Sequence, residues 1–72
     1  MEVFSTTNPR TVERIRIYSE NMVRDGSVTE VKNFDTGSTW HNSKYKCLST
    51  NREWVVYLPD HAFGGEVKVA SA

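Results

Sequence analysis

The feature that most constrains this chain is a run of five apolar residues, Trp54–Leu58, that lies between a turn and a proline. Residues 49–52, Ser-Thr-Asn-Arg, are typical of a turn. Pro59 favours the end of a strand, because proline has no N–H to donate to a neighbouring strand. The sequence therefore predicts a strand over residues 53–58.

This predicted strand is apolar on both of its faces. Side chains alternate along a strand, so one face carries Trp54, Val56 and Leu58 and the other carries Val55 and Tyr57. Continuous apolar character of this kind is typical of a strand buried on both faces. Burying each large side chain is worth about 1.5–3 kcal/mol, a large share of the stability of a small domain.

The length of the chain limits what can cover both faces. Seventy-two residues are enough for a single small globular domain, residues 1–72, in which one helix covers one face of a sheet. The second face then needs another cover. The alternatives are the loop around Trp40, closure into a small barrel, a second copy of the chain, or a different protein.

An N-terminal helix is expected over residues 9–24. Asn8 is a favourable N-cap, Pro9 suits the first helical position, and Gly26 suits the position after the helix. The apolar side chains between them follow helical spacing: Val12, Ile15, Tyr18, Met22 and Val23. A hairpin is the alternative, because residues 14–17 alternate and Asp25-Gly26 is a preferred hairpin turn.

The next segment, residues 28–34, permits either a helix or a strand. Ser27 and Glu30 match a helix capping box, and Val28, Val31 and Phe34 recur every third residue. The same stretch is rich enough in β-branched residues to be a strand that ends at the turn 35–38.

Two further strands complete the predicted fold. Lys44–Cys47 alternates basic and less polar residues, and residues 66–69 alternate charge with valine. We predict an α+β fold with the N-terminal helix packed on an antiparallel sheet of three or four strands; a small all-β SH3-like barrel is the alternative. The predicted core is Val12, Ile15, Met22, Trp54, Val56, Leu58, Val67 and Val69.

Cysteine and histidine usage predicts neither a metal site nor a cofactor. The one cysteine, Cys47, cannot form an internal disulfide and fits a reducing, cytoplasmic compartment. The ligand types His41, Cys47 and His61 lack the close pairs that structural zinc sites use. The start of the chain has no readable signal peptide, and its longest apolar run is too short for a membrane helix.

No catalytic constellation stands out, so we do not expect an enzyme. Ser43 with His41, or Cys47 with His61, are pairs that any such chain contains by chance. The favoured function is a protein-interaction or regulatory module that forms a homodimer or binds and inhibits a larger protein. Its predicted contact residues are Trp40, Val55 and Tyr57.

Nucleic-acid binding is the alternative function. Two helices followed by a hairpin would resemble a small winged helix-turn-helix, and a barrel would offer a stacking platform. Lys44, Lys46 and Arg52 would then contact phosphates. The formal net charge of zero argues against this alternative, because nucleic-acid-binding domains are usually basic.

Overall fold

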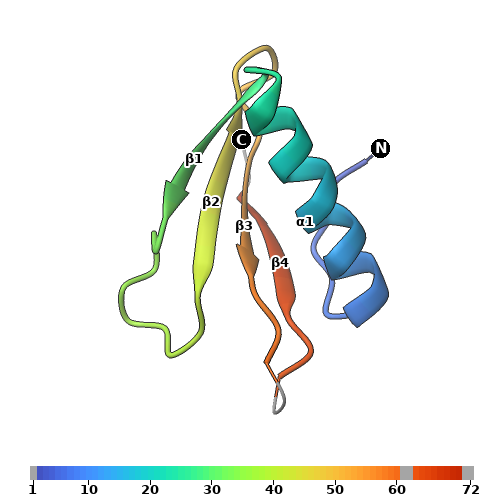
Figure 1. Cartoon of the computed structure of the whole chain (residues 1–72), viewed down its shortest axis with the longest axis vertical. Helices are drawn as coiled ribbons and strands as arrows, with labels where there is room; N and C mark the ends of the chain where they lie inside the picture. The colour runs from blue at the N-terminus through green and yellow to red at the C-terminus, as the bar shows by residue number, and fades with distance from the viewer. Residues whose placement is uncertain (1, 61–62, 71–72) are drawn as a thin grey trace.

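A computed structural model describes residues 2–60 and 63–70 of the chain. These residues form the helix α1 (Pro9–Arg24) and the strands β1 (Val28–Lys32), β2 (Asn42–Cys47), β3 (Glu53–Tyr57) and β4 (Glu66–Ala70). The strands lie in sequence order in one antiparallel sheet, with α1 against one face (Figure 1). The predicted α+β fold is confirmed. The barrel alternative is wrong, because β1 and β4 form opposite edges of an open sheet.

Helix α1 begins and ends where its sequence signals predict. The Asn8 side chain accepts hydrogen bonds from the backbone N–H groups of Arg10 (3.0 Å) and Thr11 (3.2 Å). At the other end, Gly26 has a φ of 89° and donates to Val23, while Ser27 donates to Met22. This double closure around a left-handed glycine is the Schellman motif. The hairpin alternative for residues 9–26 is therefore wrong.

The segment after α1 is a strand, so its helical alternative is wrong. Residues Val28–Lys32 pair with β2, and Asn33 donates to the backbone oxygen of Asn42 at 2.7 Å. The Ser27 N–H donates to Met22 at the end of α1, and the Ser27 carbonyl, which would accept the first bond of a new helix, accepts from Leu48 instead. Glu30 accepts from the Tyr45 hydroxyl instead of capping a helix. A winged helix-turn-helix needs the missing second helix, so that architecture is absent from the described residues.

The core lies between α1 and the sheet. Of the predicted core residues, Val12, Ile15, Trp54, Val56 and Val67 are buried, and Met22 and Val69 pack half-buried against them. Leu58 is the error. It lies beyond the end of β3, in a groove that α1 does not cover, and 37% of its surface is exposed. The buried residues that the core prediction missed are Val3, Ser19, Val28, Asn42, Tyr45 and Tyr57.

The edge of β4 is covered by the segment that precedes α1. The backbone groups of Thr6 and Val67 exchange two hydrogen bonds, of 3.0 and 2.9 Å. The Val69 N–H donates to the Ser5 hydroxyl at 3.0 Å. The Arg52 guanidinium donates to the Val3 oxygen at 2.9 Å and fastens the start of the same segment. In the part of the chain described, no helix is long and apolar enough to cross a membrane.

A buried hydrogen-bond relay joins α1 to β3. The indole N–H of Trp54 donates to the Ser19 hydroxyl at 2.8 Å, and that hydroxyl donates to the Ile15 carbonyl at 2.6 Å. Ser19 is fully buried and Trp54 is 3% exposed. The hydroxyl therefore satisfies a donor that would otherwise have no partner in the core.

We expect Ser19→Ala to lower the free energy of unfolding by about 1–3 kcal/mol, because the buried indole N–H loses its acceptor. Chemical denaturation measures the change. In a Trp54→Phe background the same substitution should cost less, since phenylalanine has no donor to leave unsatisfied. Equal costs in the two backgrounds would show that the bond between Trp54 and Ser19 contributes nothing.

Candidate interaction surface

The face of the sheet opposite α1, here called the open face, carries the predicted contact residues. The strand register arranges its side chains in three rows across the sheet. The middle row crosses all four strands and alternates valine with lysine. The rows are Thr29, Lys46, Glu53 and Ala70; Val31, Lys44, Val55 and Lys68; and Asn42, Tyr57 and Glu66.

The chain itself covers most of Tyr57, one of the predicted contact residues. The Tyr57 side chain is only 9% exposed, and its hydroxyl donates to the Asp35 carboxylate at 2.8 Å. The Lys68 ammonium lies 5.2 Å from the centre of its ring. Burial and the neighbouring Asp35 carboxylate raise the pKa of Tyr57, so the hydroxyl stays protonated as a donor. Tyr57 therefore offers little area to a partner.

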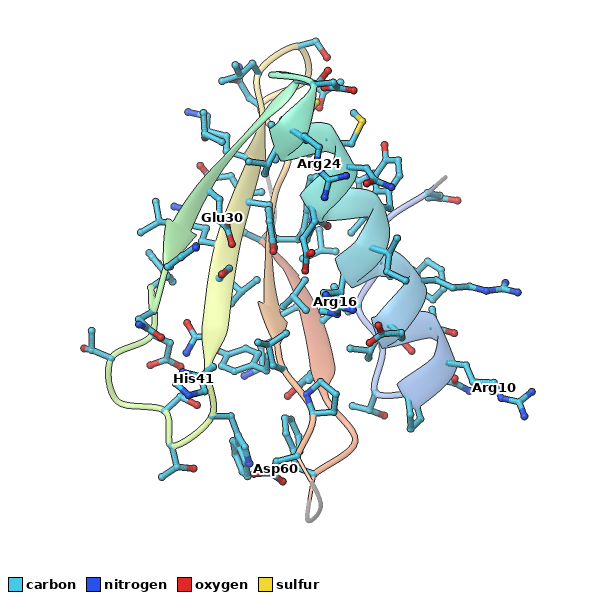
Figure 2. All side chains as sticks on the ribbon, viewed as in Figure 1. Arg10, Arg16, Arg24, Glu30, His41 and Asp60 are labelled. Carbon is cyan, nitrogen blue, oxygen red and sulfur yellow. The ribbon has the colours of Figure 1, made fainter. Side chains whose placement is uncertain are left out.

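The loop 33–41 that covers Tyr57 is held by one buried amide. Asn42 is 4% exposed, and its side-chain oxygen accepts from the Asp35 N–H at 2.8 Å. Its side-chain nitrogen donates to the backbone oxygens of Asp35 and Trp40, both at 3.0 Å. All three bonds tie residues of the loop to the start of β2. Figure 2 shows His41 at this end of the sheet, where the loop joins β2.

Trp40, the second predicted contact residue, lines a groove together with Tyr57. Its ring stacks on Phe63 of the β3–β4 connection, with ring centres 4.1 Å apart. The groove has a volume of about 320 Å³ and is also lined by Asp35 and Lys68. Trp40 remains 36% exposed. The structure thus brings Trp40 and Tyr57 to one groove, which supplies an aromatic wall and a lysine.

Val55, the third predicted contact residue, lies in the middle row, away from that groove. It is half-buried between Lys44 and Lys68 on the neighbouring strands. The aliphatic parts of lysine side chains commonly screen apolar surface in this way while their charges stay in water. Val55 keeps part of its surface available, and its position makes it central to the open face.

Two exposed apolar side chains on this face were not among the predicted contact residues. Val31 on β1 is 54% exposed, and Phe34, just beyond β1, is 48% exposed. Asn33 has a φ of 54°, which breaks the alternation of the strand. The Lys44 ammonium lies 4.8 Å from the centre of the Phe34 ring, which places that ring on the open face. The asparagine before Phe34 was the available signal, since asparagine tolerates this conformation better than most residues.

The residues expected to contact nucleic acid are mostly engaged within the chain. Lys44 forms an ion pair with Glu53 at 3.1 Å and also contacts Phe34. Arg52 donates to the Val3 backbone, as described above. Lys46 is exposed on the open face beside Glu53. The strands thus place Lys44 and Lys46 on the same face. Arg52, at the β2–β3 turn, holds the N-terminal segment instead.

A second groove lies on the helix side of the sheet, bordered by Glu20 of α1. Its volume is about 420 Å³, and its walls include Glu20, Glu30, Lys32, His41 and Leu58. The Tyr45 hydroxyl donates to Glu30 here at 3.3 Å. Burial, followed by the Glu30 charge, raises the pKa of Tyr45 to about 12, so this donor keeps its proton at neutral pH.

Residues that could hold a metal do not gather in the described ranges 2–60 and 63–70. No group of three or more His, Cys, Asp or Glu side chains is placed to bind an ion there. His61, a candidate ligand in the sequence, lies outside the described residues. Cys47 is on the helix side of β2, where its thiol lies 3.4 Å from the Ser49 hydroxyl.

Comparison with known proteins gives no relative for this surface. No protein-family model, curated protein or solved structure matches the chain. Its function is therefore inferred from the geometry of its own residues.

Replacing Asn42 by alanine should release the loop 33–41 from β2. We expect the free energy of unfolding to fall by about 1–3 kcal/mol, because backbone groups of Asp35 and Trp40 lose their buried partner. Amide hydrogen exchange at Asp35 should also become faster. Unchanged stability together with unchanged exchange at Asp35 would contradict the role given to Asn42.

Cys47 should react as a thiolate near neutral pH. Hydrogen bonds from Ser49 and Thr50 lower the pKa of its thiol from the ordinary 9.0 to about 6, so the thiolate is the main form at pH 7. The rate of alkylation by iodoacetamide, measured by mass spectrometry, should rise with pH to a midpoint near that pKa. The Ser49→Ala and Thr50→Ala variants should raise the midpoint; a wild-type midpoint near 9 would contradict this prediction.

Proposed function

We propose that this chain is a small non-catalytic protein-interaction or regulatory module that works through its open face. It acts either by pairing with a second copy or by binding and inhibiting a larger protein. The observation that carries the proposal is the half-exposed pair Val31 and Phe34, which extends the apolar surface of Val55 to the edge of the sheet.

Two properties of this surface support protein binding. Apolar side chains of this size that lie together on a small domain commonly mark a contact site, because leaving them in water is unfavourable. The exposed aromatic rings of Phe34 and Trp40 add large contact area at little cost in conformational entropy.

The charges on the open face give it a means of selecting a partner. Lys44 and Lys68 flank Val55 in the middle row, and Glu53 and Glu66 occupy the rows on either side. Such alternation favours a partner with complementary charges around an apolar centre and disfavours surfaces of one sign. The polar groups of this face bond to one another, as Lys44 does to Glu53 and Tyr57 to Asp35, which supports binding rather than catalysis.

Nucleic-acid binding through Lys44, Lys46 and Arg52 receives less support. Lys44 and Arg52 already have partners in the chain, and acidic side chains share the face with the lysines. Neutralising phosphates requires cations that are available to them, and a mixed face repels the nucleic-acid backbone as well as attracting it.

The test compares two substitutions of exposed or half-exposed β-branched residues by aspartate. Val55→Asp alters the centre of the open face, whereas Ile17→Asp alters the solvent side of α1, where Ile17 is 47% exposed. We expect Val55→Asp to weaken binding to a captured protein by at least about tenfold. Ile17→Asp should leave the affinity unchanged.

Affinity capture followed by titration of the captured protein, together with sedimentation of the pure chain, measures both forms of binding. Thermal melts establish that each variant is folded. Undiminished binding of the captured protein by Val55→Asp would sink the proposal. Binding to generic DNA at about 50 mM salt that weakens steeply as salt rises would favour the nucleic-acid alternative.

A further inference from the structure

The two edges of the sheet differ in how their backbone groups are satisfied. On β4 the outward N–H groups of Val67 and Val69 both have partners in the N-terminal segment. On either side of β1, the Ser27 carbonyl accepts from Leu48 and the Asn33 N–H donates to Asn42. The alternation of an antiparallel pair therefore turns the backbone groups of Val28, Glu30 and Lys32 outward. Within the described residues, β1 is thus the edge that lacks a covering strand.

We propose that β1 pairs antiparallel with β1 of a second copy, on a two-fold axis through Val31, and that this dimer is the self-associating form of the proposed function. The inference rests on that function, because it uses the apolar side chains at the edge of the open face. A free edge strand is a template for pairing with another chain, and a second copy supplies the same strand in the same conformation.

The outward backbone groups restrict the register of such a pair. Only Val28, Glu30 and Lys32 can form hydrogen-bonded pairs across the axis, so a symmetric dimer is centred on Thr29, Glu30 or Val31. Centring on Thr29 pairs Glu30 with Val28 of the other copy and forms no charge pair. Centring on Glu30 places two glutamates directly opposite each other, which is unfavourable. Centring on Val31 instead pairs Glu30 of each copy with Lys32 of the other, and this register forms two complementary charge pairs.

The same register brings the exposed apolar side chains together. Val31 meets its own copy at the axis on the open face, and Phe34 of each chain lies just beyond. Both side chains are about half exposed in the isolated chain, so the pairing removes apolar surface from water. Charge pairing on the helix side and apolar contact on the open side therefore support one arrangement.

The position of α1 also agrees with this register. Helix α1 crosses near the start of β1, and the far end of the strand diverges from it (Figure 1). Val31 follows Glu30 along β1, so an axis through Val31 lies nearer the far end of the strand than an axis through Glu30 does. Figure 2 labels Glu30. Because the N-terminal segment already covers the β4 edge, each copy can pair only through its β1 edge. The assembly therefore stops at a dimer.

Charge exchange between Glu30 and Lys32 tests both the dimer and its register. Glu30→Lys and Lys32→Glu should each raise the dimer dissociation constant by at least about tenfold, because each places like charges opposite each other twice. An equimolar mixture of the two variants should form a heterodimer. The double variant Glu30→Lys/Lys32→Glu should dimerise like the wild type. Sedimentation measures the four samples, and Arg14→Glu, on the exposed side of α1, is the matched control.

Cross-linking gives a second measurement that does not depend on charge. In a Cys47→Ser background, Val31→Cys should form a covalent dimer under mild oxidation, because residues opposite each other in a non-hydrogen-bonded pair are within disulfide distance. Thr29→Cys, on the same face of the same strand, should not, since the proposed register places the two copies of residue 29 far apart.

The outcomes separate this inference from the function on which it rests. A wild-type chain that stays monomeric at millimolar concentration, or a double variant that stays monomeric while the wild type dimerises, overturns the β1 dimer. If Val55→Asp still abolishes the capture of another protein, the proposed function stands without the dimer. If Val55→Asp changes no interaction and the wild type is monomeric, both fail.

Discussion

The organisation of this protein depends on one geometric constraint, which is that α1 covers only one face of the sheet. A helix of 16 residues shields Trp54, Val56 and Val67. The apolar side chains on the opposite face of the sheet need another cover. The chain provides it with short-range devices. Lysine stems flank Val55, and the loop 33–41 covers Tyr57 through its bond to Asp35. These devices cover the centre of the open face more completely than its β1 edge, where Val31 and Phe34 remain half exposed.

The sequence predicts those elements whose signals are local. The caps at Asn8 and Gly26 define α1, and strong alternation or apolar character defines β2, β3 and β4. The segment 28–32 could not be assigned in this way, because its capping box and its β-branched residues favour different structures. Pairing with β2, including Val28 opposite Cys47, decides between them, and a contact of that kind does not appear in local periodicity.

The proposed contact surface was predictable only in part, for the same reason. The two-sided strand at Trp54–Leu58 indicates apolar side chains on both faces of the sheet, and Val55 lies on the open face. The cover over Tyr57 comes from Asp35, 22 residues away, and the position of Phe34 depends on the backbone of Asn33. Leu58 shows the opposite error, since alternation places it in the core but α1 does not extend over it. Tertiary packing sets how far α1 and the loop 33–41 extend across the sheet. The sequence of a single segment does not encode that packing.

The contact between Thr6 and Val67 bears on how the chain folds. The four strands follow one another as a meander, so each hairpin can form from neighbouring residues with a small loss of chain entropy. The segment before α1 is different, because its hydrogen-bonding partner is β4, at the other extreme of the sequence. During synthesis on a ribosome, the segment before α1 therefore docks only after β4, which is made later, has emerged.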